Sequence, residues 1–135
     1  MKHSPTHNGC QVFHFAAWRW CIKRAHELLE VHESVATFHE HVLITGMEQF
    51  LPLKPAPEGR LKLIEVRVDI EYAMTKTDLS KPIILAPLSS PSGEDFGWMV
   101  IDGWHRIYRA LSEGRETLPA YLLNPAAEEA IRIPL

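Results

Sequence analysis

The stretch VIDGWHRIYRAL, residues 100–111, carries the strongest local signal in the chain. Its apolar run passes through Asp102 and Gly103 directly into a helical pattern, and the first turn of that helix carries His105 and Arg106. The first N–H groups of a helix have no partners inside the helix and lie at the positive end of its dipole. A glycine lets the backbone approach an anion closely, and an arginine can bond two anionic oxygens. The stretch therefore predicts a phosphate-binding turn.

Other side chains of this stretch have expected roles as well. Asp102 is expected to be the N-cap of the helix in the free protein. Arg109 lies one turn after His105 and is expected to reinforce the anion site. Trp104 is expected to pack in the core or at its rim, with stacking on a nucleotide base as the alternative. Tyr108 is expected to be half-buried.

Periodicity and turn residues predict the elements around this stretch. An amphipathic helix is expected over residues 13–35, where apolar residues recur at spacings of three and four. Prolines exclude regular structure from residues 51–59, and residues 1–12 are expected to be a loose arm. The remaining expected elements are strands at 42–44, 66–70, 82–86, 98–101 and 118–123, a helix at 104–113 ended by a left-handed Gly114, and a short helix at 128–131.

Length and composition limit the class of protein. The 135 residues are 46% hydrophobic, which suits one compact domain. With 14 basic and 17 acidic residues the net charge is −3, so the chain lacks the basic character of a protein that coats nucleic acid. The sequence has no apolar run long enough to span a membrane and no signal-peptide pattern at its start, so we expect a cytoplasmic protein without membrane contact.

Two residue types bear on redox and metal chemistry. The two cysteines, Cys10 and Cys21, are expected to be thiols in a reducing compartment. Eight histidines include His39 and His41 beyond the expected N-terminal helix. Structural zinc sites favour short paired spacings of Cys and His, which this sequence lacks, so a zinc site is not expected.

Three segments together resemble the domain shared by ParB N-terminal regions and sulfiredoxin. Residues 81–85 (KPIIL) resemble the family's Gln-Pro-Ile strand, and residues 102–106 (DGWHR) resemble its nucleotide-binding turn. Residues 114–120 (GRETLPA) resemble its return into a strand through Gly-x-x-x-(Val/Ile)-Pro. The match covers roughly residues 61–124. It implies an α+β fold, with a small mixed β-sheet flanked by helices over residues 60–135, onto which residues 1–50 pack as an added arm and helix.

The resemblance also implies a nucleotide site. Members of this family hold the phosphates of ATP or CTP at this turn, so Gly103, Trp104, His105, Arg106 and Arg109 are the expected nucleotide-binding residues. The position of Trp104 departs from the family pattern, because ParB has a metal-binding Glu there and sulfiredoxin has its reactive Cys. Tryptophan can do neither, so sulfiredoxin-type repair is not expected.

The function expected from this resemblance is a Mg²⁺-dependent phosphohydrolase or nuclease that binds a nucleoside triphosphate and acts with DNA. Asp102 and Glu65 are the expected catalytic carboxylates, with Asp102 as the Mg²⁺ ligand. Two alternatives remain open. One is a non-catalytic interaction module that docks on a protein partner through the N-terminal helix, and the other is a small-molecule kinase.

Overall fold

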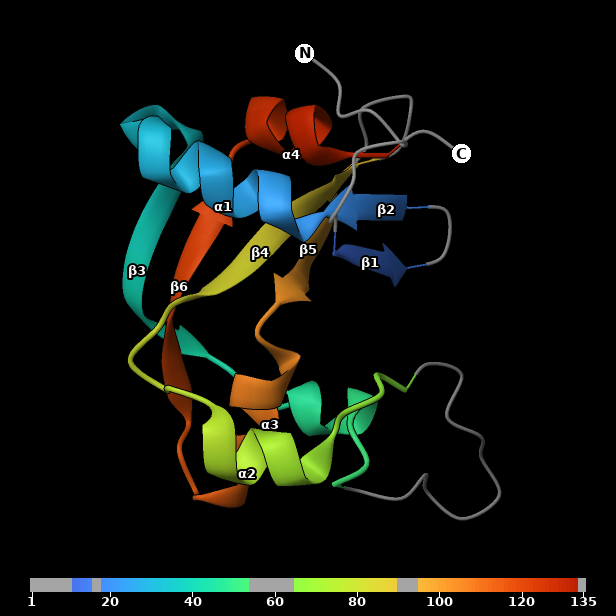
Figure 1. Ribbon diagram of the computed structural model, residues 1–135, viewed down its shortest axis with the longest axis vertical. Helices are drawn as coiled ribbons and strands as arrows, with labels where there is room; N and C mark the ends of the chain where they lie inside the picture. The colour runs from blue at the N-terminus through green and yellow to red at the C-terminus, as the bar shows by residue number, and fades with distance from the viewer. Residues whose placement is uncertain (1–10, 16–17, 54–64, 90–94, 134–135) are drawn as a thin grey trace. The chain divides into compact units, whose positions relative to one another are not determined.

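The computed structural model describes residues 11–15, 18–53, 65–89 and 95–133, and it shows an α+β protein (Figure 1). The strands and α-helices described are β1 (Val12–Phe15), β2 (Trp18–Cys21), α1 (Ile22–Val31), β3 (Ala36–Leu43), α2 (Ile70–Lys76), β4 (Ile83–Ser89), β5 (Asp95–Asp102), α3 (Trp104–Ser112), β6 (Thr117–Leu123) and α4 (Pro125–Ile131). Two short 3₁₀ helices, η1 (Glu33–Val35) and η2 (Met47–Phe50), lie on either side of β3 in the sequence.

Internal contacts divide the chain into two compact units, each assembled from separate segments. The first unit takes its described residues from the ranges 1–38, 84–102 and 121–135. The second takes them from 39–83 and 103–120. The start of α3, with its expected phosphate-binding residues, belongs to the second unit, and Asp102 belongs to the first.

The described strands form a four-stranded sheet with the order β3-β6-β4-β5 and a separate β1-β2 hairpin. Strands β4 and β5 are antiparallel, with Leu85 opposite Val100. The N–H of Asn124 donates to the carbonyl of Val35 at 2.9 Å, and the N–H of Ile44 donates to the carbonyl of Glu116 at 2.9 Å. These bonds join the start of β3 to the end of β6 and the end of β3 to the start of β6, so the two strands are antiparallel. Strand β3 forms one edge of the sheet (Figure 1).

The N-terminal part of the expected helix at 13–35 is wrong, because Val12–Phe15 and Trp18–Cys21 form two paired antiparallel strands. Phe13 stacks on Trp20 and Phe15 stacks on Trp18 across the hairpin, with ring centroids 6.2 and 6.1 Å apart. Aromatic cross-strand pairs of this kind stabilise a strand pair, and aromatic residues are enriched in strands. The helix itself is confirmed only over Ile22–Val31.

The core of the first unit lies where α1, α4 and β2 pack on the sheet. Trp20 is fully buried there. The same buried hydrophobic cluster includes Ile22, Ala25, Leu28, Ile84, Ala86, Leu88, Ile101, Leu123, Ala127 and Ile131. The alternate residues of β4 in this set point to one face of the sheet, as the period of two requires.

In the second unit, the strand expected at residues 66–70 is wrong. Residues 65–69 have no regular structure, and α2 begins at Ile70. The side chain of Asp69 accepts a hydrogen bond from the N–H of Tyr72 at 3.0 Å, which is a helix N-cap. This local cap, with Glu71 in the first turn and Lys76 in the last, favours a helix over the strand that the alternating valines suggest.

Several expected elements are confirmed with small changes in their ends. The helix after residue 103 is α3, and Gly114 follows it with a left-handed φ of 79°. The N–H of Gly114 bonds the carbonyl of Leu111, and that of Arg115 bonds Ala110, which together end the helix. The strand expected at 42–44 is longer, because β3 begins at Ala36.

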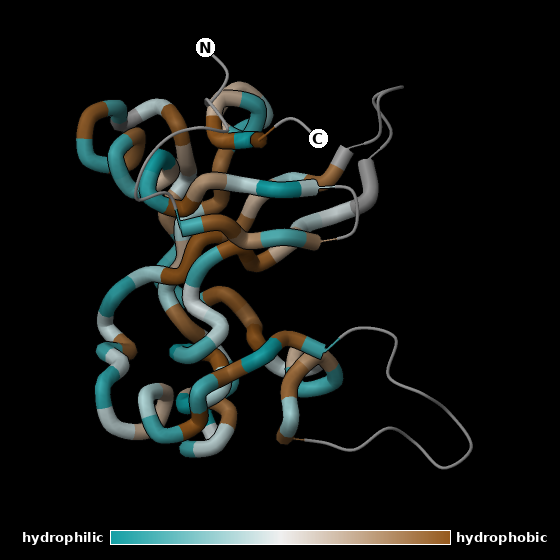
Figure 2. The backbone as a smooth tube through the Cα atoms, turned by 45° about the vertical axis from the view of Figure 1, so that its right-hand side comes forward, coloured by the Kyte–Doolittle hydropathy of each residue, from teal (hydrophilic) through white to brown (hydrophobic). Residues whose placement is uncertain are grey.

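Hydrophobic and hydrophilic residues alternate along the described chain and do not gather in one long run (Figure 2). Among the described residues, no helix combines the length and apolar character needed to cross a membrane. Cys21 is disulfide-bonded, so the expectation that it is a thiol is wrong. The other cysteine of the sequence, Cys10, lies outside the described residues.

Candidate functional site

The first turn of α3 begins at a position that only glycine can occupy without strain. Gly103 has a φ of 111°, in the left-handed region. A Cβ at this position would lie 2.4 Å from Cγ2 of Ile83, closer than real carbon contacts allow. The N-cap of α3 is Gly103, so the expectation that Asp102 occupies the cap position is wrong by one residue. Asp102 is instead the last residue of β5.

Arg106 is held close to the start of α3 by backbone carbonyls. Its Nη1 donates to the carbonyl oxygen of Lys81 at 2.8 Å and to that of Pro82 at 2.5 Å. Both acceptors immediately precede β4. The result is a permanent positive charge at a fixed position one turn from Gly103.

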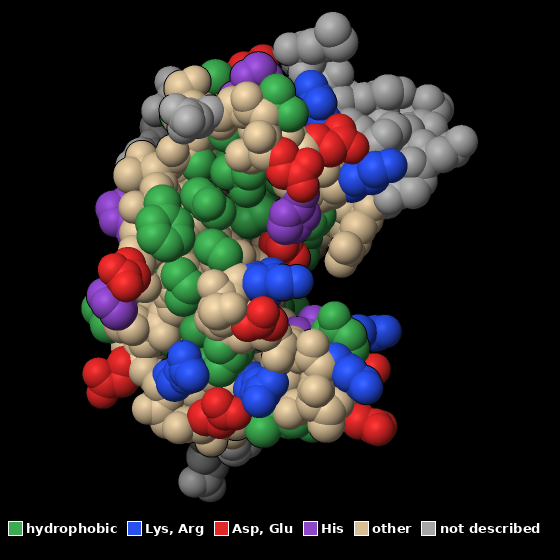
Figure 3. Space-filling view, turned by 60° about the vertical axis from the view of Figure 1, so that its left-hand side comes forward, with side chains coloured by type: hydrophobic (Ala, Val, Ile, Leu, Met, Phe, Trp, Pro, Cys, Tyr) green, Lys and Arg blue, Asp and Glu red, His purple; other side chains and the backbone are tan. Residues whose placement is uncertain are grey.

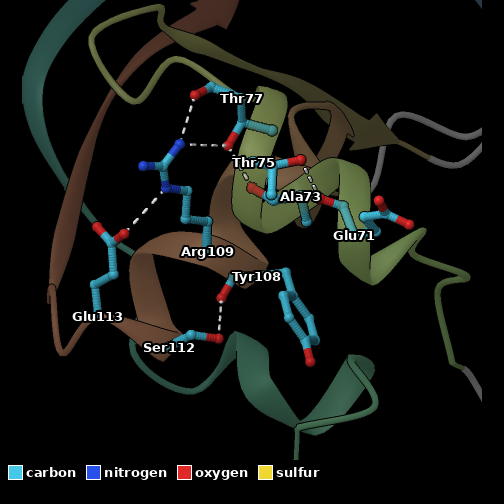
Figure 4. Close-up of polar contacts among 8 residues, drawn as sticks. All are labelled: Glu71, Ala73, Thr75, Thr77, Tyr108, Arg109, Ser112 and Glu113. Atoms are coloured by element: carbon cyan, nitrogen blue, oxygen red, sulfur yellow. Dashed lines mark hydrogen bonds and ion pairs between the residues drawn. The ribbon is translucent and has the colours of Figure 1, made fainter.

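Arg109 makes a similar contact further along α3 (Figure 4). Its Nη1 donates to the carbonyl of Thr77 at 2.7 Å, and its Nε donates to the Glu113 carboxylate at 3.0 Å. Thr77 is the C-cap residue of α2, so Arg109 connects the end of α2 to α3. The two arginines together anchor the segment 77–82 on α3.

His105 joins the start of α3 to the start of α2. Its Nε2 accepts a hydrogen bond from the N–H of Asp69 at 3.1 Å, which places the proton of the neutral ring on Nδ1. The ring of Tyr72 meets that of His105 edge-on, with centroids 5.2 Å apart. No sequence signal pointed to either neighbour, because both depend on a helix that the sequence did not predict.

Trp104 packs inside the second unit, as expected for a core or rim residue. It is 6% exposed, and its ring meets that of Phe50 edge-on with centroids 6.2 Å apart. Stacking on a nucleotide base needs an accessible ring face, which this burial does not offer. Tyr108, expected to be half-buried, is buried.

The two expected catalytic carboxylates belong to different units. Asp102 accepts a hydrogen bond from, or pairs with, Nε2 of His26 at 2.8 Å within the first unit, and the two side chains are 18% and 52% exposed. Glu65 is exposed and belongs to the second unit. Sequence analysis missed His26, because 76 residues separate it from Asp102 and no local pattern links them.

Within the segment that the arginines anchor, Asp78 is stabilised in its charged form. The pKa of Asp78 is lowered from its ordinary value, first by hydrogen bonds from the Ser80 hydroxyl and N–H, and then by the charges of Lys81 and Arg106. The carboxylate therefore stays ionised at neutral pH. Acidic and basic side chains are interspersed on the face that Figure 3 shows.

Among the described residues, no group of three or more His, Cys, Asp and Glu side chains gathers that could hold a metal ion. Comparisons of the chain with protein-family models, with curated proteins and with solved structures found no match.

Proposed function

We propose that this protein binds a nucleoside triphosphate, ATP or CTP, by its phosphates at the start of α3. Gly103, His105, Arg106 and Arg109 form the proposed site, all within the second unit. The observation that carries the proposal is the start of α3 itself. The backbone there requires glycine, while Arg106 is fixed one turn away. A helix start with a bare glycine and a fixed guanidinium suits an anion with several oxygens.

The fold that we propose is that of the ParB and sulfiredoxin domain. Its support is the order of elements around the turn, in which β4 and β5 lead through Gly103 into α3, and Gly114 leads into β6. This is the order in which the resembling sequence segments occur. The assignment of the protein to the α+β class rests on its helices and strands and does not depend on this proposal.

The proposed chemistry is Mg²⁺-dependent hydrolysis of a phosphate ester, with DNA as the proposed partner. Mg²⁺ is held in proteins by one or two carboxylates together with phosphate oxygens, and Asp102 and Glu65 are the proposed carboxylates. Arg106 would then stabilise the charge that develops on the phosphoryl group as it is transferred.

The first test is calorimetric titration of the full chain with ATP and with CTP, each with Mg²⁺. We expect binding by the wild type and at least a tenfold loss of affinity in Arg106→Ala. Because Arg106 also holds the carbonyls of Lys81 and Pro82, each variant is first compared with the wild type by thermal unfolding. Arg24→Ala is the matched control, since Arg24 pairs with Glu27 on α1 in the other unit. Wild-type protein that binds neither nucleotide would contradict the proposal.

A second test separates binding from catalysis. Asp102→Ala and Glu65→Ala should keep nucleotide affinity and lose hydrolysis if these carboxylates hold the metal. Hydrolysis at the wild-type rate in both variants would exclude them from the reaction.

The second candidate function is a non-catalytic interaction module. Burial of Trp104 and the engagement of both arginines with backbone carbonyls favour it, because these contacts also explain the same residues as structural. Under this alternative, wild-type hydrolysis would be no faster than that of Arg106→Ala, and neither nucleotide would bind.

A further inference from the structure

We propose that Tyr72, on α2, stacks on the base of the nucleotide whose phosphates bind at the start of α3. Every nucleobase has a flat π-face, and proteins bind it without regard to sequence by stacking an aromatic side chain on it. The inference rests on the proposed nucleotide site and adds the residue that recognises the nucleoside part of the ligand.

Tyr72 lies beside the first turn of α3, although it belongs to the neighbouring helix (Figure 1). Its ring meets that of His105 edge-on, with centroids 5.2 Å apart. His105 comes two residues after Gly103, and its Nε2 accepts a hydrogen bond at 3.1 Å from the N–H of Asp69, the N-cap residue of α2. All four residues belong to the second unit. Tyr72 is therefore held at the border of the proposed phosphate site.

The ring of Tyr72 is accessible from solvent. The residue is 50% exposed. In an edge-on pair the two rings do not lie face to face, so His105 meets at most one face of the phenol ring. The N–H of Tyr72 donates to the Asp69 carboxylate at 3.0 Å, which fixes the backbone that carries the ring. Tyr72 thus combines a fixed position with an open aromatic surface.

The other aromatic rings described in the second unit do not offer such a surface. Trp104 and Tyr108 are buried. Phe50 is half-buried, and its ring packs against that of Trp104. The stacking role considered for Trp104 therefore passes to Tyr72. The sequence did not indicate this residue, because α2 was not expected and no local spacing links Tyr72 to His105.

Stacking on a phenol ring selects a ligand by the area of its base and not by hydrogen bonds to the edges of the base. A purine has more ring area than a pyrimidine, so we expect ATP to bind more tightly than CTP. Inorganic tripolyphosphate carries the same number of phosphorus atoms without a base, and we expect it to bind more weakly than either nucleotide. The ligand class is then nucleoside triphosphates, with a modest preference for purines.

The test is calorimetric titration of the full chain with ATP and with tripolyphosphate, each with Mg²⁺. Tyr72→Ala is expected to bind ATP about tenfold more weakly than the wild type and tripolyphosphate equally well. Tyr72→Phe keeps the ring and is expected to retain the affinity for ATP. Met74→Ala is the matched control, because Met74 is another exposed apolar residue of α2. Thermal unfolding of each variant is compared with the wild type first.

The two ligands separate failure of this inference from failure of the nucleotide site. Wild-type protein that binds neither ATP nor tripolyphosphate would contradict the site itself. If the wild type binds both, the role of Tyr72 alone is overturned when Tyr72→Ala keeps the wild-type affinity for ATP. Equal loss of affinity for both ligands in that variant would likewise overturn it, because stacking acts only on the base.

A fluorescent base gives a readout that a structural role of Tyr72 would not move. The fluorescence of 2-aminopurine falls when it stacks on an aromatic ring, so its riboside triphosphate reports the contact directly. At saturating ligand with Mg²⁺, we expect quenching in the wild type and in Tyr72→Phe, and its loss in Tyr72→Ala. Equal quenching in the wild type and in Tyr72→Ala would refute the stacking contact.

Discussion

At the scale of a single residue, two independent features of the structure require a glycine at position 103. Its φ of 111° is a conformation that side chains with a Cβ rarely adopt. Ile83 fills the space where a Cβ would go, at 2.4 Å from Cγ2 and 2.8 Å from Cβ. Gly114 has a left-handed φ as well, but nothing lies within 4 Å of a Cβ added there. Backbone strain and steric overlap can therefore be separated experimentally.

Gly103→Ala is expected to lower the free energy of unfolding by about 3 kcal/mol, because strain and overpacking each cost about 1–3 kcal/mol. Gly114→Ala, with strain alone, is expected to cost about 1 kcal/mol. Urea denaturation of both variants beside the wild type measures the difference. Equal losses in the two variants would mean that the Ile83 contact relaxes at no cost.

Glu128 is the one buried charged side chain among the described residues, at 2% exposure. Its carboxylate accepts hydrogen bonds from Nε1 of Trp20 at 2.9 Å and from Nε of Arg132 at 2.8 Å, and it pairs with Nη2 of Arg132 as well. These bonds to Glu128 raise the pKa of Arg132 above its ordinary value. The arrangement ties α4 to β2 in the core of the first unit.

Glu128→Gln removes the charge with little change of shape and is expected to destabilise the protein by about 2 kcal/mol, the usual value for a hydrogen bond to a charged group. The neighbouring Glu129→Gln, at an exposed position of α4, is expected to change stability by less than about 0.5 kcal/mol. Chemical denaturation followed by tryptophan fluorescence reports the change, because Trp20 contacts the altered group. A Glu128→Gln variant as stable as Glu129→Gln would show that the buried bonds contribute nothing net.

At the scale of elements, α4 is fixed at its start by one side chain that bonds in two directions. The Asn124 side-chain oxygen accepts from the N–H of Ala127 at 2.8 Å, and its side-chain nitrogen donates to the carbonyl of Ser34 at 2.6 Å. Pro125 follows at the first helical position, where its missing N–H costs nothing. The cap therefore both starts α4 and holds the segment before β3.

Asn124→Ala is expected to lower stability by about 2 kcal/mol, about 1 kcal/mol for the lost cap and the rest for the unpaired carbonyl. Asn124→Asp keeps the cap and loses only the donor to Ser34, so it is expected to lower stability by about half as much as Asn124→Ala. Thermal unfolding of the two variants separates the contributions. Equal destabilisation by both substitutions would assign the whole effect to the bond with Ser34.

The elements show where local sequence is sufficient for prediction. Residues around Gly103 and Gly114 predicted α3 and its ends, because glycine conformation and capping are local. The pairing of β1 with β2 was not predicted, since Phe13 and Trp20 fit a helical spacing as well as a cross-strand pair. Only tertiary packing of the aromatic rings decides between the two.

The same limit applies to the candidate site. The glycine and the cationic residues of α3 could be identified from spacing alone. Their partners could not, because the carbonyls of Lys81 and Pro82 and the N–H of Asp69 come from segments 24 to 36 residues away. Contacts at that distance depend on how the segments fold back.

At the scale of the whole molecule, the disulfide at Cys21 makes the stability of the chain depend on the redox conditions. Cys21 is fully buried, and its sulfur accepts a hydrogen bond from the N–H of Arg24 at the start of α1. A disulfide restricts the unfolded chain and adds about 2–4 kcal/mol in typical proteins. We expect reduction to lower the melting temperature by several degrees, and Cys21→Ser to reproduce the loss without further change on reduction. In native, non-reduced protein, iodoacetamide should leave Cys21 unmodified by mass spectrometry. Alkylation of Cys21 after unfolding without reductant would show that the disulfide is absent in solution.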